Sequence, residues 1–350
     1  MNIKNLRHIL NEMRYFRRLV KRYGKSLYQG KYRLFPSMRA IVLEREDSIE
    51  RATPYFHKKI GASKKTALID KVNALGYYRN RKKGSGDLYE AIYSANNYDK
   101  VREIKLFSFE RKRILTVCTS KEARDTQLAE YEALHEAFGM PCVTENNLYP
   151  NAYEISMVEL LPRPEEVEAL AEIARCTAAH HRVHPFCDQR STADVLRADY
   201  GDEALSAPLA LLASSVSEDA KARSIPLCLQ HGDLSRDNLI YGTCDGYEGF
   251  FWIDWEHKRA RLFFYDYFFY ILNTAMYYSD TAALDAYLSG ACDAHLDAFF
   301  KTFGMTYEKD RKKDYFMIFA VDFLRQRVAD LGNVSVLNTY VDFIGNIKFK

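Results

Sequence analysis

Apolar and basic residues recur at helical spacing in the first 25 residues of the chain. Each set repeats three or four residues apart, which is the pattern of an amphipathic helix with one basic face. The apolar positions are Ile3, Leu6, Leu10, Met13 and Val20, and the basic positions are Lys4, Arg7, Arg14, Arg18, Lys21 and Lys25. A second helix is predicted over 64–75, and the charged, glycine-containing segment 79–86 indicates a linker. We therefore expect residues 1–86 to form a basic helical extension.

From residue 87 the pattern changes to short β-rich runs separated by polar turns. The runs 88–94, 101–109 and 114–119 predict three antiparallel strands, and the next segment, 121–138, has the pattern of a helix. A strand pair should follow and end at 155–161, where Pro162 and Pro164 break the sheet. Residues 87–161 are thus expected to form a small antiparallel sheet with one helix.

The remainder of the chain, 162–350, is mainly helical in pattern. Helices are predicted over 165–181, 192–199, 203–216, 264–278, 281–301 and 309–330. Short strands are expected at 227–230, 238–241 and 250–253. The fold class that follows is α+β, with a small sheet-containing lobe, a helical lobe and a helical N-terminal extension.

Composition narrows the class of protein. The 350 residues are 47% hydrophobic, which is enough for a sizeable core, and the net charge of +3 does not indicate nucleic-acid binding. Residues 1–40 are an exception, with eleven Lys or Arg against one acid, a net charge of +10. The seven cysteines are scattered without a CxxC pair, which favours a reducing compartment. No apolar run reaches the roughly 20 residues of a membrane span. We expect a cytoplasmic protein, which could attach peripherally to the inner face of the cell membrane. The sequence leaves two alternatives for the helix over 3–25: it contacts an anionic membrane surface, or it packs its apolar face on the body of the protein with the basic face in solvent.

The strongest chemical signal is the run His231-Gly-Asp-Leu-Ser-Arg-Asp-Asn238, followed by Ile253-Asp-Trp-Glu256. Phosphoryl transfer needs a carboxylate that orients the attacking hydroxyl and oxygen ligands that hold Mg²⁺ against the phosphates. Asp233 is the candidate base. Asn238 and Asp254 are the candidate metal ligands, because hard cations prefer carbonyl and carboxylate oxygens.

These segments resemble the catalytic loop and metal-binding motif of the aminoglycoside phosphotransferase and choline kinase family, which has a protein-kinase-like fold. Among proteins of this kind, the chain resembles kinases of bacterial envelope saccharides. The resemblance covers roughly residues 87–330 and includes the 15-residue gap between Asn238 and Asp254. It implies ATP and Mg²⁺ as cofactors, with Asp233 as base and Asn238 and Asp254 as magnesium ligands. It also implies that Asp266 hydrogen-bonds the loop; we expect His231 to orient the loop without titrating.

The nucleotide-binding half is less similar to the family. By resemblance, Glu130 lies on the helix whose glutamate pairs with a phosphate-binding lysine, and the segment Val158, Glu159 and Leu160 corresponds to the hinge that reads adenine. The turn 94–99 contains no glycine. The expected lysine is absent from the third strand, where Thr116 and Cys118 stand in its place. Arg113, Lys121 and Lys105 are left as candidate replacements.

The predicted function is transfer of the γ-phosphate to a hydroxyl of a small molecule or saccharide. The segment after Asp254 leaves no room for an activation loop, which disfavours protein substrates. An envelope lipopolysaccharide or capsule sugar is the leading acceptor, and choline-like amines and aminoglycosides come next. A non-catalytic, kinase-like binding module is the alternative, because the phosphate-binding lysine is missing. A metal-dependent glycosyltransferase or nuclease fits the strand order less well.

Overall fold

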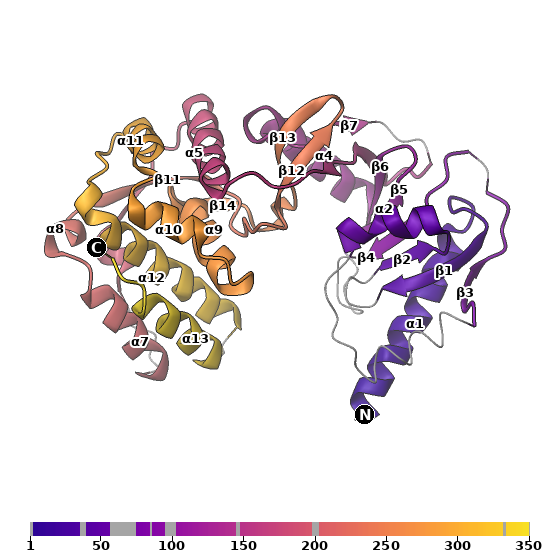
Figure 1. Cartoon of the computed structure of the whole chain (residues 1–350), viewed down its shortest axis with the longest axis horizontal. Helices are drawn as coiled ribbons and strands as arrows, with labels where there is room; N and C mark the ends of the chain where they lie inside the picture. The colour runs from indigo at the N-terminus through magenta and orange to yellow at the C-terminus, as the bar shows by residue number, and fades with distance from the viewer. Residues whose placement is uncertain are drawn as a thin grey trace. The chain divides into compact units, whose positions relative to one another are not determined.

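The chain forms two compact units in the computed structural model, which describes residues 3–35, 40–56, 75–84, 86–94, 103–144, 148–197, 203–331 and 334–349 (Figure 1). The N-terminal unit contains Met1–His135, Pro141–Leu161 and Thr243–Glu248. The C-terminal unit contains Glu136–Met140, Pro162–Gly242 and Gly249–Lys350. We describe each unit by itself.

An antiparallel eight-stranded sheet forms the centre of the N-terminal unit, in the order β3-β1-β2-β4-β5-β6-β8-β7. The strands are β1 (Gly30–Phe35), β2 (Ala40–Leu43), β3 (Tyr78–Asn80), β4 (Ala91–Ser94), β5 (Glu103–Ser108), β6 (Arg113–Cys118), β7 (Val143–Thr144) and β8 (Ala152–Ser156). The described helices of this unit are α1 (Ile3–Tyr23), α2 (Glu46–Phe56) and α4 (Lys121–Phe138), and the short strand β9 (Glu159–Leu160) follows β8 in the chain. The three strands, the helix and the later strand pair predicted for residues 87–161 are all present.

Residues 1–86 differ from the expected helical extension. They contribute β1, β2 and β3 to the same sheet as β4–β8, and the compact units do not divide at 79–86. The strands were missed because they are short, at six, four and three residues, although the alternation of basic and apolar residues on β1 is itself typical of a half-buried strand. On β1, Tyr32 and Leu34 are buried opposite Leu43 and Ile41, while the side chains between them face solvent. The helix predicted over 64–75 lies outside the described residues except for its last position.

Helix α1 packs its apolar face into the core of the N-terminal unit. Met13, Phe16, Leu19, Val20 and Tyr23 are buried in one cluster with residues of β1, β2, β4, β5 and β6. Burial of one such side chain stabilises a fold by about 1.5–3 kcal/mol. The sequence left two alternatives for this helix, contact with a membrane surface or packing on the body of the protein. From Met13 onward, the structure shows packing.

The C-terminal unit is mainly helical, as predicted. Its helices are α5 (Glu166–Val183), α6 (Thr192–Val195), α7 (Glu203–Ser214), α8 (Glu218–Lys221), α9 (Tyr265–Tyr277), α10 (Ala282–Ser289), α11 (Asp293–Thr302), α12 (Lys312–Leu331) and α13 (Val334–Gly345). The remaining strands among the described residues are β10 (Gln189–Ser191), β11 (Ser224–Gln230), β12 (Leu239–Cys244), β13 (Tyr247–Trp252) and β14 (Arg259–Leu262). The single helix predicted over 281–301 is two helices, because Gly290 adopts a left-handed conformation (φ 92°) that ends α10.

Aromatic side chains fill much of the helical core. Helix α9 is buried along most of its length, and its Phe268 ring lies within 6 Å of the rings of Tyr287, Phe316 and Phe319. This packing fixes α9, which carries Asp266 in its first turn. None of the described helices combines the length and the apolar composition that a membrane span requires.

Candidate active site

The segment 231–238 follows β11 directly and folds into a tight loop. Main-chain hydrogen bonds join the amide of Ser235 to the carbonyl of Asp233 at 2.9 Å and the amide of Asn238 to the carbonyl of Ser235 at 3.0 Å. Gly232 has φ 84°, and a Cβ there would lie 2.5 Å from the carbonyl oxygen of His257. Only glycine fits this position, so the chain can turn sharply just before Asp233.

Asp266 holds the start of this loop. Its carboxylate accepts hydrogen bonds from the amides of His231 (2.5 Å) and Gly232 (2.8 Å), and its own amide donates to Gln230 Oε1 at 2.8 Å. The side chain is buried, and burial raises the pKa of Asp266 to about 6, against the lowering effect of the two amides. A buried acceptor with two backbone donors fixes the loop relative to α9.

His231 joins the loop to the segment that follows β13. Its Nε2 lies 2.8 Å from the carbonyl oxygen of Ile253, and its Nδ1 accepts a hydrogen bond from the amide of Asp233 at 3.3 Å. Burial lowers the pKa of His231 to about 4, and its ring packs 4.8 Å from that of Trp255. These contacts require the neutral imidazole with the proton on Nε2. His231 is therefore placed to orient the loop, without a change of charge near neutral pH.

Asn238 and Asp254 are brought together by a main-chain contact. The amide of Ile253 donates to the carbonyl of Asn238 at 3.0 Å, so the residue after it, Asp254, is adjacent to the loop. Asp254 is exposed and has a left-handed conformation (φ 67°), which is uncommon for a residue other than glycine. Such conformations concentrate at functional sites, where the surrounding structure holds them in place.

These two residues fit a magnesium ion. Asn238 donates through Nδ2 to the carbonyl of Asp233 at 2.7 Å, which leaves its Oδ1 as the atom available to a cation. No group of three or more His, Cys, Asp or Glu side chains that could hold a metal occurs among the described residues. Two protein oxygens are what magnesium needs when phosphates and water complete its octahedral shell.

The carboxyl of Asp233 is half-buried in a charged environment. Burial raises its pKa, the positive charges of Arg327, His257 and Arg261 lower it, and the negative charge of Asp254 raises it. Arg327 Nη2 lies 3.9 Å from Asp233 Oδ1. This arginine comes from α12, far along the chain, and the sequence analysis did not single it out. No local motif marks it.

Arg236 anchors the middle of the loop and was also not singled out from the sequence. Its guanidinium lies 2.5 Å from a carboxylate oxygen of Glu166 on α5 and 2.5 Å from one of Asp280, just after α9. Glu166 also accepts a hydrogen bond from Tyr270 at 2.6 Å. Because Arg236 stands between Asp233 and Asn238 in the sequence, these ion pairs restrict the positions of both.

The predicted nucleotide-binding residues lie in the N-terminal unit. Glu130 is half-buried on α4. The carbonyl of Val158 accepts a hydrogen bond from the Tyr55 hydroxyl at 2.7 Å, and Glu159 is paired with Lys112 at 2.5 Å, while Leu160 is partly exposed. Most of the glycine-free turn 94–99 is outside the described residues.

Two of the three candidate phosphate-binding cations have partners of their own. Lys105 is paired with Glu103 at 2.9 Å on the same strand. Arg113 contacts the Ser156 hydroxyl and lies 3.8 Å from Asp245. Lys121 is exposed at the first position of α4. Lys105, Arg113 and Lys121 thus all lie in the N-terminal unit and stay candidates for contact with the phosphates.

Comparison with known proteins gave matches only among solved structures; no family model and no curated protein matches the chain. A GDP complex of aminoglycoside 2′-phosphotransferase-IIIa is similar, with 12% identity, 73% of this chain and 92% of that chain covered, and a TM-score of 0.42. A macrolide 2′-phosphotransferase type I is also similar, with 13% identity, 83% of this chain and 100% of that chain covered, and a TM-score of 0.40. Choline kinase LicA from Streptococcus pneumoniae has 9% identity, with 81% of this chain and 99% of that chain covered and a TM-score of 0.39. Because these identities and TM-scores are low, the functional proposal rests on the loop geometry.

Proposed function

We propose that this protein is an ATP-dependent phosphotransferase that moves the γ-phosphate to a hydroxyl of a small molecule or saccharide. The observation that carries the proposal is the contact between two segments, in which Asn238 bonds the backbone of Asp233 through its side chain and that of Ile253 through its own backbone. These contacts bring the carboxyl of Asp233 close to Asn238 and Asp254, whose side-chain oxygens suit a metal ion. Phosphoryl transfer requires this set of groups.

Each residue has a role that follows from its surroundings. Asp233 is held by the loop and has a raised pKa, so its carboxylate can orient the acceptor hydroxyl and accept its proton. Asn238 and Asp254 would hold Mg²⁺ through their side-chain oxygens. When bound, the ion neutralises charge on the transferring phosphate. His231, Arg236 and Asp266 keep the loop in this conformation.

For the acceptor we propose an envelope saccharide first, with choline-like amines and aminoglycosides as further candidates. Attachment of residues 3–25 to an anionic membrane would depend mainly on charge, because the apolar face from Met13 to Tyr23 is buried.

A non-catalytic nucleotide-binding module is the second candidate function, since Lys105 and Arg113 have partners within the N-terminal unit. Thermal-shift measurement of Mg·ATP binding, followed by transfer from labelled ATP to envelope-glycan and amino-alcohol panels, separates the two. Binding without transfer to any acceptor favours the module.

Asp254→Ala should remove magnesium-dependent nucleotide binding. The substitution takes away the carboxylate that would hold the metal, and we expect a loss of at least about tenfold in Mg·ATP affinity, as for the removal of a metal-ligand contact. Calorimetry with and without magnesium measures the effect. Glu256→Ala, which removes another exposed carboxylate two residues away, is the matched control. Unchanged Mg·ATP affinity in Asp254→Ala would contradict the metal role.

Arg327→Ala should move the acidic limb of the pH–rate profile to higher pH. The base works as a carboxylate, and the charge of Arg327 lowers its pKa, so removal of that charge raises the pKa of Asp233 and more of the enzyme is protonated at a given low pH. The measurement is kcat/KM against pH with a soluble acceptor. Arg327→Lys keeps the charge and should retain most of the original profile. An alanine variant with an unshifted limb would show that the arginine does not act on Asp233.

A further inference from the structure

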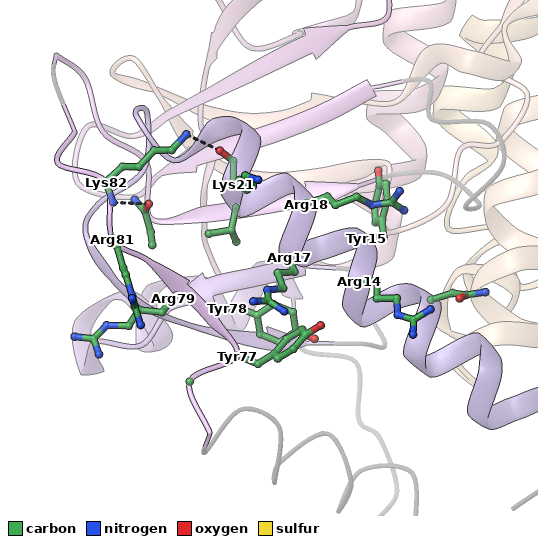
Figure 2. Close-up of a pocket in the computed structure, with 14 residues that line it drawn as sticks. Arg14, Tyr15, Arg17, Arg18, Lys21, Tyr77, Tyr78, Arg79, Arg81 and Lys82 are labelled. Carbon is green, nitrogen blue, oxygen red and sulfur yellow. Dashed lines mark hydrogen bonds between the residues drawn. The ribbon is translucent and has the colours of Figure 1, made fainter.

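A groove of about 1190 Å³ runs between α1 and the segment around β3 in the N-terminal unit (Figure 2). Seven basic side chains line it, and we call it the basic groove. They are Arg14, Arg17, Arg18, Lys21, Arg79, Arg81 and Lys82. Figure 2 shows Arg14, Arg17, Arg18 and Lys21 extending from α1, with Arg79, Arg81 and Lys82 on the neighbouring segment. Two parts of the chain some sixty residues apart thus supply one positively charged surface.

No carboxylate among the described residues neutralises the positive charge of the basic groove. All seven cations are exposed, and none of the described residues that line the groove is acidic. Nor does any of the seven form an ion pair with a carboxylate from the part of the chain that the structure describes. Clustered like charges repel one another, and a bound anion relieves that repulsion. The groove is therefore suited to a ligand with several negative charges.

The basic groove is built on a rigid base. The opposite face of α1 is packed in the core. The buried Asn80 on β3 donates hydrogen bonds to the carbonyls of Gly24 (2.8 Å) and Leu27 (3.1 Å), and these bonds hold the chain after α1 against the strand. The Lys82 ammonium donates to the carbonyl of Lys21 at 2.7 Å. The cations of α1 are three or four residues apart, which places neighbours about 5–6 Å from each other along the helix. Such a row matches a ligand whose anionic groups repeat along a chain.

The residue types favour phosphate as the repeating anion. Five of the seven cations are arginines, whose planar guanidinium groups bind phosphate oxygens in pairs. The guanidinium of Arg17 lies 4.7 Å from the centre of the Tyr77 ring. The ring orients the guanidinium, and the guanidinium in turn covers one face of the ring. Tyr15 and Tyr78 are buried. Because bases bind single-strand sites by stacking on open aromatic faces, the groove is poorly equipped for nucleic acid.

The shape and burial also disfavour a bilayer as the ligand. The site is concave, whereas a bilayer surface is flat on this scale. The apolar residues of α1 from Met13 to Tyr23, which would have to enter the lipid beside the groove, are in the protein core. We propose that the basic groove binds a flexible chain of phosphate groups without bases, such as a phosphodiester-linked glycan or a polyphosphate. This inference goes beyond the proposed catalysis and does not depend on it.

Binding of the full-length protein to four probes with equal numbers of phosphates tests the proposal. They are inorganic polyphosphate, poly(glycerol phosphate), oligo-dT and vesicles of phosphatidylcholine with phosphatidylglycerol. We expect the first two to bind more tightly than the others. If about four phosphates are contacted, the affinity should fall roughly 50-fold between 50 and 200 mM salt, as counterion release predicts. Binding of one polymer but not the other would support the site and identify the carrier.

Charge reversal within and outside the groove locates the site. Arg14→Glu with Arg18→Glu should weaken polymer binding by about 30-fold or more at low salt, because two contacts become repulsive. Arg22→Glu with Lys25→Glu makes the same change in net charge at exposed positions that do not line the groove, and should change affinity by less than about threefold. Circular dichroism checks that both variants fold. Equal losses in the two variants, no binding of either polymer, or tighter binding of oligo-dT or vesicles would overturn the proposal.

Discussion

Asp233→Asn should abolish phosphotransfer while leaving the affinity for Mg·ATP nearly intact. The substitution keeps the size of the side chain and the backbone carbonyl that Asn238 contacts, but it removes the group that accepts the proton. Loss of a general base lowers turnover by a factor of roughly 10²–10⁴. Transfer from labelled ATP measures turnover, and calorimetry measures nucleotide affinity.

Asp237→Asn is the matched control, since it removes a negative charge from the same loop at an exposed position. It should retain most of the activity. Substantial turnover in Asp233→Asn would refute the assignment of the base. Loss of Mg·ATP binding in Asp233→Asn would instead indicate that Asp233 contributes to the metal site. In that case its Mg·ATP affinity should fall as far as that of Asp254→Ala.

Removal of α1 should unfold the N-terminal unit. Deletion of residues 1–23 takes six large buried side chains from the core, and at about 2 kcal/mol each this amounts to roughly 12 kcal/mol of burial before the entropy of the helix is subtracted. A typical domain is stable by only about 5–15 kcal/mol. We expect the truncated protein to aggregate, or to lose a cooperative thermal transition measured by circular dichroism.

A point substitution tests the same packing without the loss of the helix. Phe16 is fully buried, and Phe16→Ala should lower the free energy of unfolding by about 3–5 kcal/mol. Arg7→Ala, on the exposed face of α1, should change it by no more than about 0.5 kcal/mol. A truncated protein that melts at the temperature of the full chain would mean that α1 is a detachable surface helix after all.

Local sequence patterns determined most of the secondary structure. The helix predicted over 121–138 coincides with α4, and the turns around the run 231–238 were recognised from the residues that form them. These features depend on side-chain period and on glycine, proline and short polar residues, which act within a few positions of the chain. The same locality explains an error, since the periodicity of 281–301 continues through Gly290, whose left-handed conformation separates α10 from α11.

The candidate chemistry was likewise predictable, because Asp233, Asn238 and Asp254 lie in two short segments with a short connection. Only the tertiary structure decided what surrounds them. Arg327 approaches Asp233 from α12, and Asp280 reaches Arg236 from the segment after α9. Such contacts join residues that are distant in sequence, and no local pattern encodes them.

The N-terminal segment shows the same division. The sequence alone determined that 3–25 is an amphipathic helix with a basic face, since this follows from its period. It did not determine which surface covers the apolar face, because a lipid interface and a protein core favour the same residues. The sheet decides this: β2 pairs with β4 of the following segment, so that β1, β2 and β3 share one sheet with β4–β8. The assembled unit contains both the core that buries Phe16 and the basic groove. Strand pairing between distant segments therefore decided the role of a helix whose existence was already evident from its sequence.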